Sequence, residues 1–290
     1  MTVIATTVFY NRLDLLEIWM NELKDVVDKF VVLEGNISHT GIPRELVYKP
    51  ELFKDFNVKY VPITDMPPFD KVHWDRMERY LNASIVKALE GCEDTDLILF
   101  NHSDEVIKTK AFELAKKEML KYVEKHVDTE AVIHFHLIQC RYWLNCFLSK
   151  QEGFTGAGPV LSTFRVMREV GPWRMKHIYP GLPCVNIINA GWHYSWTGPK
   201  EYILDKLYNT VEQSYNKPEM FNFEYIQKVM DEGGDILQEA RNFNDGKWIG
   251  TLFLNPNNER VSSQFLPLHV KNNLDKFKDV IKIKDSYNIG

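Results

Sequence analysis

The sequence is poor in the features that mark secreted, membrane-spanning and disulfide-bonded proteins. Only four of its 290 residues are cysteine, and no two of them form a CxxC pair or a zinc-ligand spacing. We therefore expect reduced core thiols in a cytoplasmic protein. No apolar run approaches the roughly 18 residues of a membrane span, and no basic leader opens the chain, so we expect neither a membrane anchor nor a signal peptide.

Excess positive charge is also absent. Lys and Arg total 35 against 40 Asp and Glu, which leaves a formal net charge of −5 with neutral histidines. A chain with this balance has no global basic field, so we expect no nucleic-acid or anionic-lipid partner. Internal repeats, low-complexity tracts and linkers are lacking too. We therefore expect one domain over residues 1–290, which is long enough to bury a sizeable core.

The pattern of apolar residues predicts an α/β protein. Val3–Phe9 is rich in β-branched residues, a helical stripe follows from Asp14, and Phe30–Leu33 is a second apolar run. A helix between two strands indicates a βαβ unit and a parallel sheet. We predict that a mostly parallel mixed sheet flanked by helices continues the chain. The further expected strands lie in Val58–Ile63, Leu97–Phe100, Ala131–Leu148 and Val160–Met167, and the further helices begin at Asp70 and Thr109 or span Lys200–Thr210, Phe221–Glu232 and Val270–Ile281.

The most informative stretch is Asp96–Val106, which reads DLILFNHSDEV. A short apolar run that ends in polar residues is typical of a buried strand, and ligands of open α/β sheets bind at the carboxyl ends of such strands. His102 and Asp104 alternate with Ser103, so in an extended segment both would project from the same side. An imidazole and a carboxylate there could share a divalent cation. The alternative is a strand followed by a polar turn.

Several stretches together resemble glycosyltransferase family 17. They are LDLLEIWMNELKDVVDKFVVLEGN (13–36), TGIPRELVY (40–48), WDR (74–76), DLILFNHSDEV (96–106), AGWHYSW (190–196) and FEYIQKVMDEGG (223–234). The resemblance implies a GT-A fold, with a Rossmann-like nucleotide-sugar-binding half (1–106) and an acceptor-binding half (107–290). It also implies an enzyme that inverts the anomeric centre, with Mn²⁺ or Mg²⁺ as cofactor and a UDP-sugar as donor.

The resemblance also implies where a metal would bind. Family members usually carry D-x-D-E where this chain has His102-Ser103-Asp104-Glu105, so histidine replaces the first acid. Asp104 and His102 are then the expected metal ligands, and His193 of AGWHYSW is a third candidate. A histidine hydrogen-bonded within an aromatic turn is the alternative for His193. Glu105 could hold a metal ligand in place or orient the donor sugar.

The remaining site candidates concern the nucleotide, the base and the acceptor. For the nucleotide we favour Asn11, Glu34 and Arg76, with Glu34 accepting hydrogen bonds from ribose or uracil and Arg76 contacting phosphate. A salt bridge is the alternative for Arg76, and burial is the alternative to sugar stacking for Trp192 and Trp196. The sequence leaves the general base open among Asp104, Glu105 and Glu152. Acceptor candidates, which could equally fill the core, are Tyr142, Trp143 and Asn145.

The sequence thus predicts a metal-assisted inverting glycosyltransferase. Its donor is expected to be UDP-N-acetylglucosamine and its acceptor a glycan, in a bacterial or viral setting, which means the host cytoplasm if viral. One alternative is a non-catalytic protein that binds nucleotide sugars or carbohydrates on a degenerate GT-A fold. A second alternative is a nucleotidyltransferase or phosphohydrolase on a similar scaffold.

Overall fold

The computed structural model describes residues 1–70, 75–125, 131–146, 158–177, 184–209, 218–232 and 266–281. The chain divides into two compact units. The first comprises Met1–Leu137 and Gly153–Trp192, and the second comprises Ile138–Glu152 and His193–Gly290. The division into nucleotide and acceptor halves at residue 106 stays a prediction.

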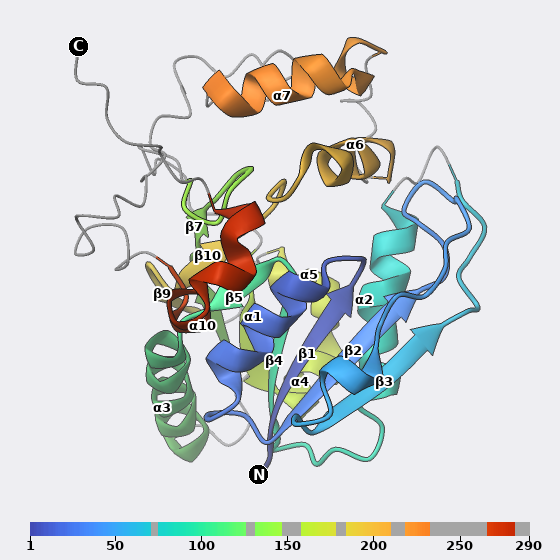
Figure 1. The fold of residues 1–290 in the computed structure, drawn as a ribbon. Helices are drawn as coiled ribbons and strands as arrows, with labels where there is room; N and C mark the ends of the chain where they lie inside the picture. Colours follow the sequence, from blue (N-terminus) through green and yellow to red (C-terminus); the bar gives the residue numbers. More distant parts are fainter. Residues whose placement is uncertain are drawn as a thin grey trace. The chain divides into compact units, whose positions relative to one another are not determined.

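A seven-stranded sheet forms the centre of the first unit, in the order β3-β2-β1-β4-β8-β6-β9 (Figure 1). The parallel strands on one side of this order are β1 (Val3–Phe9), β2 (Lys29–Gly35), β3 (Val58–Ile63) and β4 (Leu97–His102). The others are β8 (Val160–Thr163), which is antiparallel to both neighbours, and the parallel pair β6 (Val132–Phe135) and β9 (Cys184–Ile187). The mixed, mostly parallel, Rossmann-like α/β fold is confirmed.

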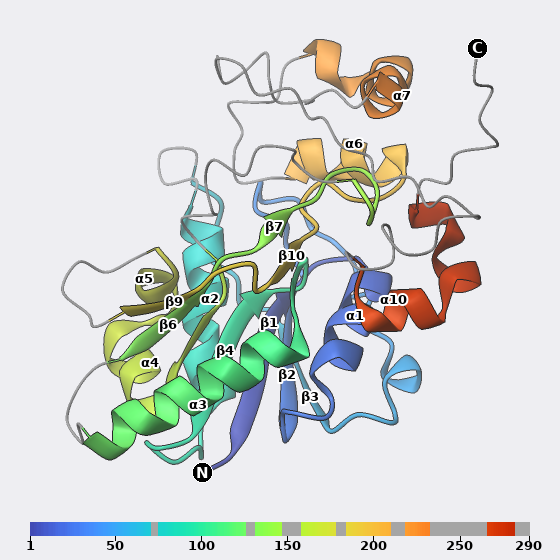
Figure 2. The ribbon, with the colours of Figure 1, turned by 90° about the vertical axis from the view of Figure 1, so that its left-hand side faces the viewer.

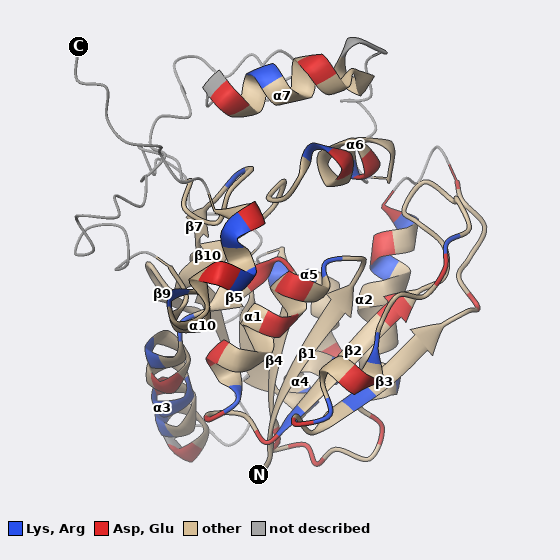
Figure 3. Ribbon diagram, viewed as in Figure 1, with Lys and Arg blue, Asp and Glu red and all other residues tan. Residues whose placement is uncertain are grey.

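Helices cover both faces of this sheet (Figures 1 and 2). On one face lies α1 (Leu13–Leu23), whose Trp19 ring packs 5.1 Å from the Phe30 ring of β2. The other face carries α2 (Arg76–Ala88), α4 (Phe164–Val170) and α5 (Pro172–Lys176), which share one apolar core with β1, β2 and β4. Figure 3 shows that β1 and β4 carry no charged residue, as burial on both faces requires.

The short strand β5 (Glu105–Ile107) follows β4 directly and leads into α3 (Thr109–Lys125), whose Thr109 hydroxyl donates to the Glu22 carbonyl at the end of α1. β5 neighbours β10 (Gly191–His193). A Cβ on Gly191 would fall against the Val106 carbonyl oxygen and 2.9 Å from Ile107 Cα. Glycine at this position therefore permits the close approach of the two backbones.

The second unit has its own apolar cluster, in which Tyr142 and Trp196 pack with residues of two helices. The Tyr142 N–H donates to the Trp196 carbonyl at 2.9 Å, and both residues adopt positive φ. Its elements are β7 (Ile138–Gln139), α6 (Lys200–Asn209), η3 (Pro218–Phe221), α7 (Phe223–Glu232), α10 (Leu268–Asn272) and η5 (Leu274–Val280). Among the described residues of the whole chain, no helix is long and apolar enough to cross a membrane.

Several predicted elements differ from the structure, and the helix expected from Asp70 is α2, which begins at Arg76. The expected long strand or hairpin in Ala131–Leu148 is two short strands, β6 and β7, and residues 147–148 lie outside the described ones. The expected strand Val160–Met167 ends at Thr163, because the Thr163 hydroxyl accepts the Val166 N–H at 3.4 Å and caps α4. The expected helix Val270–Ile281 is instead α10 and η5, separated at Asn273. The four cysteines are free thiols, but only Cys140 and Cys146 are buried in the core as expected, whereas Cys92 is half-buried and Cys184 is exposed.

Candidate active site

The carboxyl ends of β1 and β4 mark the place where this sheet reverses its strand order. β1 is followed in the chain by β2 on one side, whereas β4 lies on its other side. Val8 pairs with His102, so the ends of the two strands lie level. Ligands of open α/β sheets bind at such a switch point. Asn11, which follows β1, and His102, which ends β4, therefore lie at the predicted edge.

The segment after β4 is not extended through Asp104. The strand ends at His102, Ser103 and Asp104 form a turn, and β5 begins at Glu105. His102 and Asp104 therefore do not alternate along a continuous strand, which was the condition for predicting that both project from the same side. Both side chains are half-buried.

Glu105 lies in a buried ion pair. Its Oε2 accepts from Lys176 Nζ of α5 at 2.5 Å and from the backbone N–H of His102 at 2.7 Å. The Glu105 and Lys176 side chains are each 2% exposed. The ammonium also lies 5.3 Å from the centroid of the Phe100 ring. Both the Lys176 ammonium and the Glu105 carboxylate are therefore removed from solvent, next to the Ser103–Asp104 turn.

Glu78 of α2 faces the imidazole of His102. Its Oε1 lies 3.9 Å from His102 Nε2, and the two side chains are 17% and 28% exposed. Burial raises the pKa of Glu78, and the positive charges of Lys176 and His177 oppose that effect. Glu78 of α2 and Lys176 of α5 thus both lie next to the end of β4.

The gap between Glu78 and His102 is suited to a shared cation. A separation of 3.9 Å is too long for a hydrogen bond. Imidazole nitrogen and carboxylate oxygen each bind transition metals at about 2.0–2.2 Å, so one ion fits between the two atoms. Within the described part of the chain, no three His, Cys, Asp or Glu side chains are grouped to hold a metal. These residues therefore fit a cation whose remaining ligands come from elsewhere, such as the phosphates of a nucleotide.

Glu34 points to the opposite face of the sheet. It pairs with Phe9, whereas His102 pairs with Val8, and successive residues of a strand face opposite sides. Its buried carboxylate accepts hydrogen bonds from four donors of the protein itself. These are Arg44 Nη2 at 3.0 Å, the Val47 N–H at 2.8 Å, the Tyr48 N–H at 3.1 Å and the Tyr60 hydroxyl at 2.9 Å. The structure thus uses Glu34 to hold residues 44–48.

The other candidates are dispersed. Arg76, the first residue of α2, is exposed, and Trp192 is buried with 3% of its surface exposed. His193 belongs to the second unit, where its carbonyl accepts the Cys140 N–H at 2.9 Å. In that unit, the acceptor candidates Tyr142 and Asn145 and the stacking candidate Trp196 have buried side chains. Glu152 and Trp74 lie outside the described residues.

Sequence reasoning missed Glu78 and Lys176. Glu78 lies in a run of charges on α2 that usually indicates a solvated face, yet it is mostly buried. Its position directly after the core residue Met77 was the available signal. Lys176 lies 71 residues beyond its partner Glu105, so no local spacing could connect them.

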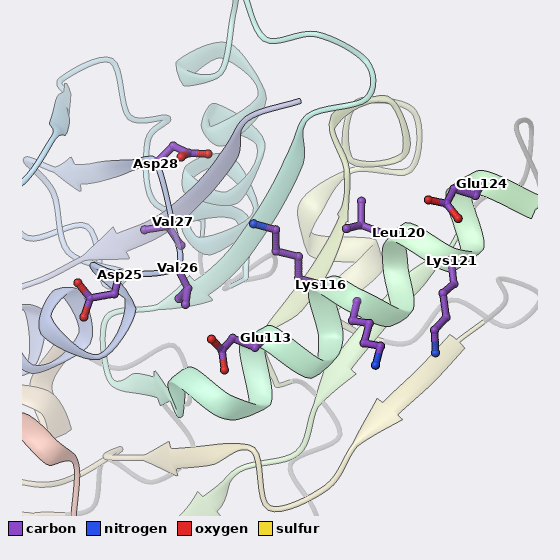
Figure 4. Close-up of a pocket in the computed structure, with 10 residues that line it drawn as sticks. Asp25, Val26, Val27, Asp28, Glu113, Lys116, Leu120, Lys121 and Glu124 are labelled. Atoms are coloured by element: carbon purple, nitrogen blue, oxygen red, sulfur yellow. The ribbon is translucent and has the colours of Figure 1, made fainter.

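A separate surface hollow of about 610 Å³ lies at the other end of the sheet (Figure 4). Its lining comes from Asp25–Asp28, which immediately precede β2, and from α3. Figure 4 shows Lys116 reaching from α3 toward the 25–28 segment. The hollow mixes charges of both signs and contains none of the site candidates.

Comparison with known proteins gives a consistent result. The profile described as glycosyltransferase family 17 matches residues 1–282. Beta-1,4-mannosyl-glycoprotein 4-beta-N-acetylglucosaminyltransferase of Rattus norvegicus is 24% identical over 94% of this chain and 53% of its own length. The Homo sapiens protein of that name is 25% identical over 77% of this chain and 46% of its own length. The chain thus spans about half the length of these curated relatives.

Likeness to solved structures is weaker. The crystal structure of mannose-6-phosphate isomerase from Helicobacter pylori is 14% identical, covers 58% of this chain and 72% of that chain, and has a TM-score of 0.35. The family assignment rests on the sequence profile, which covers nearly the whole chain. The chain belongs to glycosyltransferase family 17.

Proposed function

We propose that this protein is a metal-assisted inverting glycosyltransferase that moves N-acetylglucosamine from a UDP donor onto a glycan acceptor. Family membership supports glycosyl transfer, and the printed names of the relatives support the sugar. We place the donor site at the switch point of the sheet because Glu78 Oε1 lies 3.9 Å from His102 Nε2 there.

In this proposal the charge of the leaving group is the chemical problem. As the glycosidic bond breaks, the nucleoside diphosphate gains negative charge, and catalysis requires positive charge placed there in advance. A divalent cation held beside the diphosphate would supply it. His102 and Glu78, with Asp104 in the adjacent turn, are the residues that would hold this ion. Imidazole as a ligand favours a transition metal such as Mn²⁺ over Mg²⁺.

The arrangement narrows the search for the general base. An inverting transfer needs a group that accepts the proton of the acceptor hydroxyl. Glu105 is a poor choice, because it is buried and its Oε2 already accepts from Lys176 and from the His102 N–H. Glu152 remains a candidate, and Asp104, which is half-buried in the turn, remains one only if its carboxylate does not hold the cation.

A second candidate function is binding of a nucleotide sugar without turnover. It is favoured by His102 in place of the family's usual acid and by the lack, among described residues, of a three-residue metal group. Such a protein would bind the donor and release no nucleoside diphosphate. A cytoplasmic location and a bacterial or viral source remain proposals alongside it.

A thermal-shift experiment tests donor and metal together. The protein is melted with UDP-N-acetylglucosamine, with Mn²⁺, with both, and with both plus EDTA. A ligand that binds only the folded state raises the melting temperature. The proposal expects the largest rise with both, reversed by EDTA. An equal rise with and without Mn²⁺ would contradict metal assistance, and no rise with any UDP-sugar would contradict the donor.

A further inference from the structure

The Glu105–Lys176 pair is unusual among the described ion pairs of this chain. Both of its side chains are 2% exposed, whereas every other described pair keeps at least one partner at 13% or more. Moving two charges out of water is costly, and replacing such a pair with apolar residues of similar volume often leaves stability unchanged or increased. Stability is therefore a weak reason for a chain to keep this pair.

The geometry indicates another role. Lys176 Nζ lies 2.5 Å from Glu105 Oε2, and the same oxygen accepts the His102 N–H at 2.7 Å. The Ser103–Asp104 turn lies between these two anchored residues. Lys176 thus fixes the carboxylate, and the carboxylate fixes the backbone at the end of β4.

The helix that carries Lys176 also reaches the second side of the site. α5 packs against α2, and the charges of Lys176 and its neighbour His177 both act on Glu78. The start of α5 is set by Gly171, whose φ of 89° lies in the left-handed region and permits the sharp change of direction after α4. α5 therefore places the Lys176 ammonium next to both the β4–β5 turn and α2, the helix that bears Glu78.

We propose that Lys176 is a positioning residue for the diphosphate end of the donor site. This inference rests on the proposed function, since it assumes that the turn after His102 receives the donor. Lys176 does not touch the donor, because its side chain is buried. It acts through Glu105, by holding His102 and Asp104 in the orientation that the diphosphate and its cation require.

The test uses the variants Lys176→Met, Glu105→Gln, the double variant Glu105→Gln/Lys176→Met, and Lys176→Arg. Each is measured for melting temperature, for kcat and KM with UDP-N-acetylglucosamine, and for hydrogen exchange of backbone amides in residues 102–107. Lys121→Met is the matched control, because Lys121 is an exposed lysine of α3 whose carboxylate partner Glu118 is also accessible.

We expect Lys176→Met to melt at a lower temperature, because it leaves Glu105 charged and unpaired. The double variant removes both charges and should melt near the wild-type temperature. The kcat/KM of the double variant for the donor should nevertheless be at least about tenfold lower than that of the wild type, mainly because KM rises. Its backbone amides 102–107 should exchange faster. Lys176→Arg, which keeps the charge, should recover part of the activity. The control should match the wild type throughout.

Recovery of both donor kcat/KM and amide protection in the double variant would overturn the inference, because activity would then simply follow stability. If the double variant does not fold, Lys176→Met decides when it is measured below its own melting temperature, since amides 102–107 as protected as in the wild type and an unchanged donor KM would overturn the inference. If the wild type releases no nucleoside diphosphate, the proposed function fails instead. Hydrogen exchange at 102–107 still decides whether Lys176 holds the turn, because it requires no turnover.

Discussion

Glu78 Oε1 and His102 Nε2 lie 3.9 Å apart at the carboxyl end of β4, on side chains that are mostly buried. The two residues come from a helix and a strand that are both well packed in the core of the first unit. This spacing is the geometric basis for placing a cation at the switch point of the sheet.

The first prediction concerns Glu78. Replacing Glu78 with Gln removes one anionic oxygen from the pair with His102, so the Mn²⁺ concentration for half-maximal turnover should rise about tenfold or more. The melting temperature without metal should change little, because Gln preserves the volume. Glu90→Gln, an exposed carboxylate just beyond the same helix, is the control. A Mn²⁺ dependence equal to that of the wild type would remove Glu78 from the metal site.

The second prediction concerns Glu34. Replacing Glu34 with Ala removes the buried acceptor of the Tyr60 hydroxyl and the ion-pair partner of Arg44, whose guanidinium keeps the Gly35 and Tyr10 carbonyls as acceptors. We expect the free energy of unfolding, measured by urea denaturation, to fall by about 3–5 kcal/mol. Glu45→Ala, at an exposed neighbouring position, should cost far less. A Glu34→Ala protein of normal stability that fails to bind UDP would instead support the nucleotide contact predicted from the sequence.

The third prediction tests the close approach of β5 and β10. A methyl group on Gly191 meets the Val106 carbonyl and Ile107 Cα, and both of these neighbours are backbone atoms that cannot move aside cheaply. Gly191→Ala should therefore lower the free energy of unfolding by about 1–3 kcal/mol or more. Gly191→Ala with wild-type stability in urea would show that the strands lie further apart.

The fourth prediction concerns pH. Burial, reinforced by the nearby His136, lowers the pKa of His134 from 6.5 to about 4. Between these values the unfolded chain binds a proton that the folded chain does not, so stability is complete above pH 6.5 and is lost as the pH falls toward 4. The loss should amount to about 3 kcal/mol.

The measurement is urea denaturation at a series of pH values for the wild type and for His134→Gln. The variant should lack this part of the pH dependence, because glutamine does not titrate. Parallel stability curves for the two proteins between pH 4 and pH 6.5 would contradict the assignment to His134.

The fold was largely predictable because its signals are local. The composition of Val3–Phe9 and Val58–Ile63 indicated strands with the observed bounds, and the apolar run Leu97–Phe100 indicated the strand that the structure extends to His102. The failures have physical causes as well. Thr163 ends its strand through a side-chain cap, and Ser103 and Asp104 turn where alternation assumed extension.

The site was less predictable because its contacts join distant segments. Glu78 resembles a member of a solvated charge run until α5 is packed over it, and Lys176 has no sequence signal that connects it to Glu105. Glu34 lies at the carboxyl edge of the sheet, as predicted. Only the strand register shows that its side chain points to the face opposite His102.

Metal-assisted transfer is tested most directly by the release of UDP from UDP-N-acetylglucosamine, measured by chromatography for the wild type and Asp104→Ala with Mn²⁺ or with EDTA. We expect release by the wild type with Mn²⁺, loss of release in EDTA, and a rate at least about tenfold lower in Asp104→Ala. Release that continues unchanged in EDTA and in Asp104→Ala would contradict metal-assisted transfer at the end of β4.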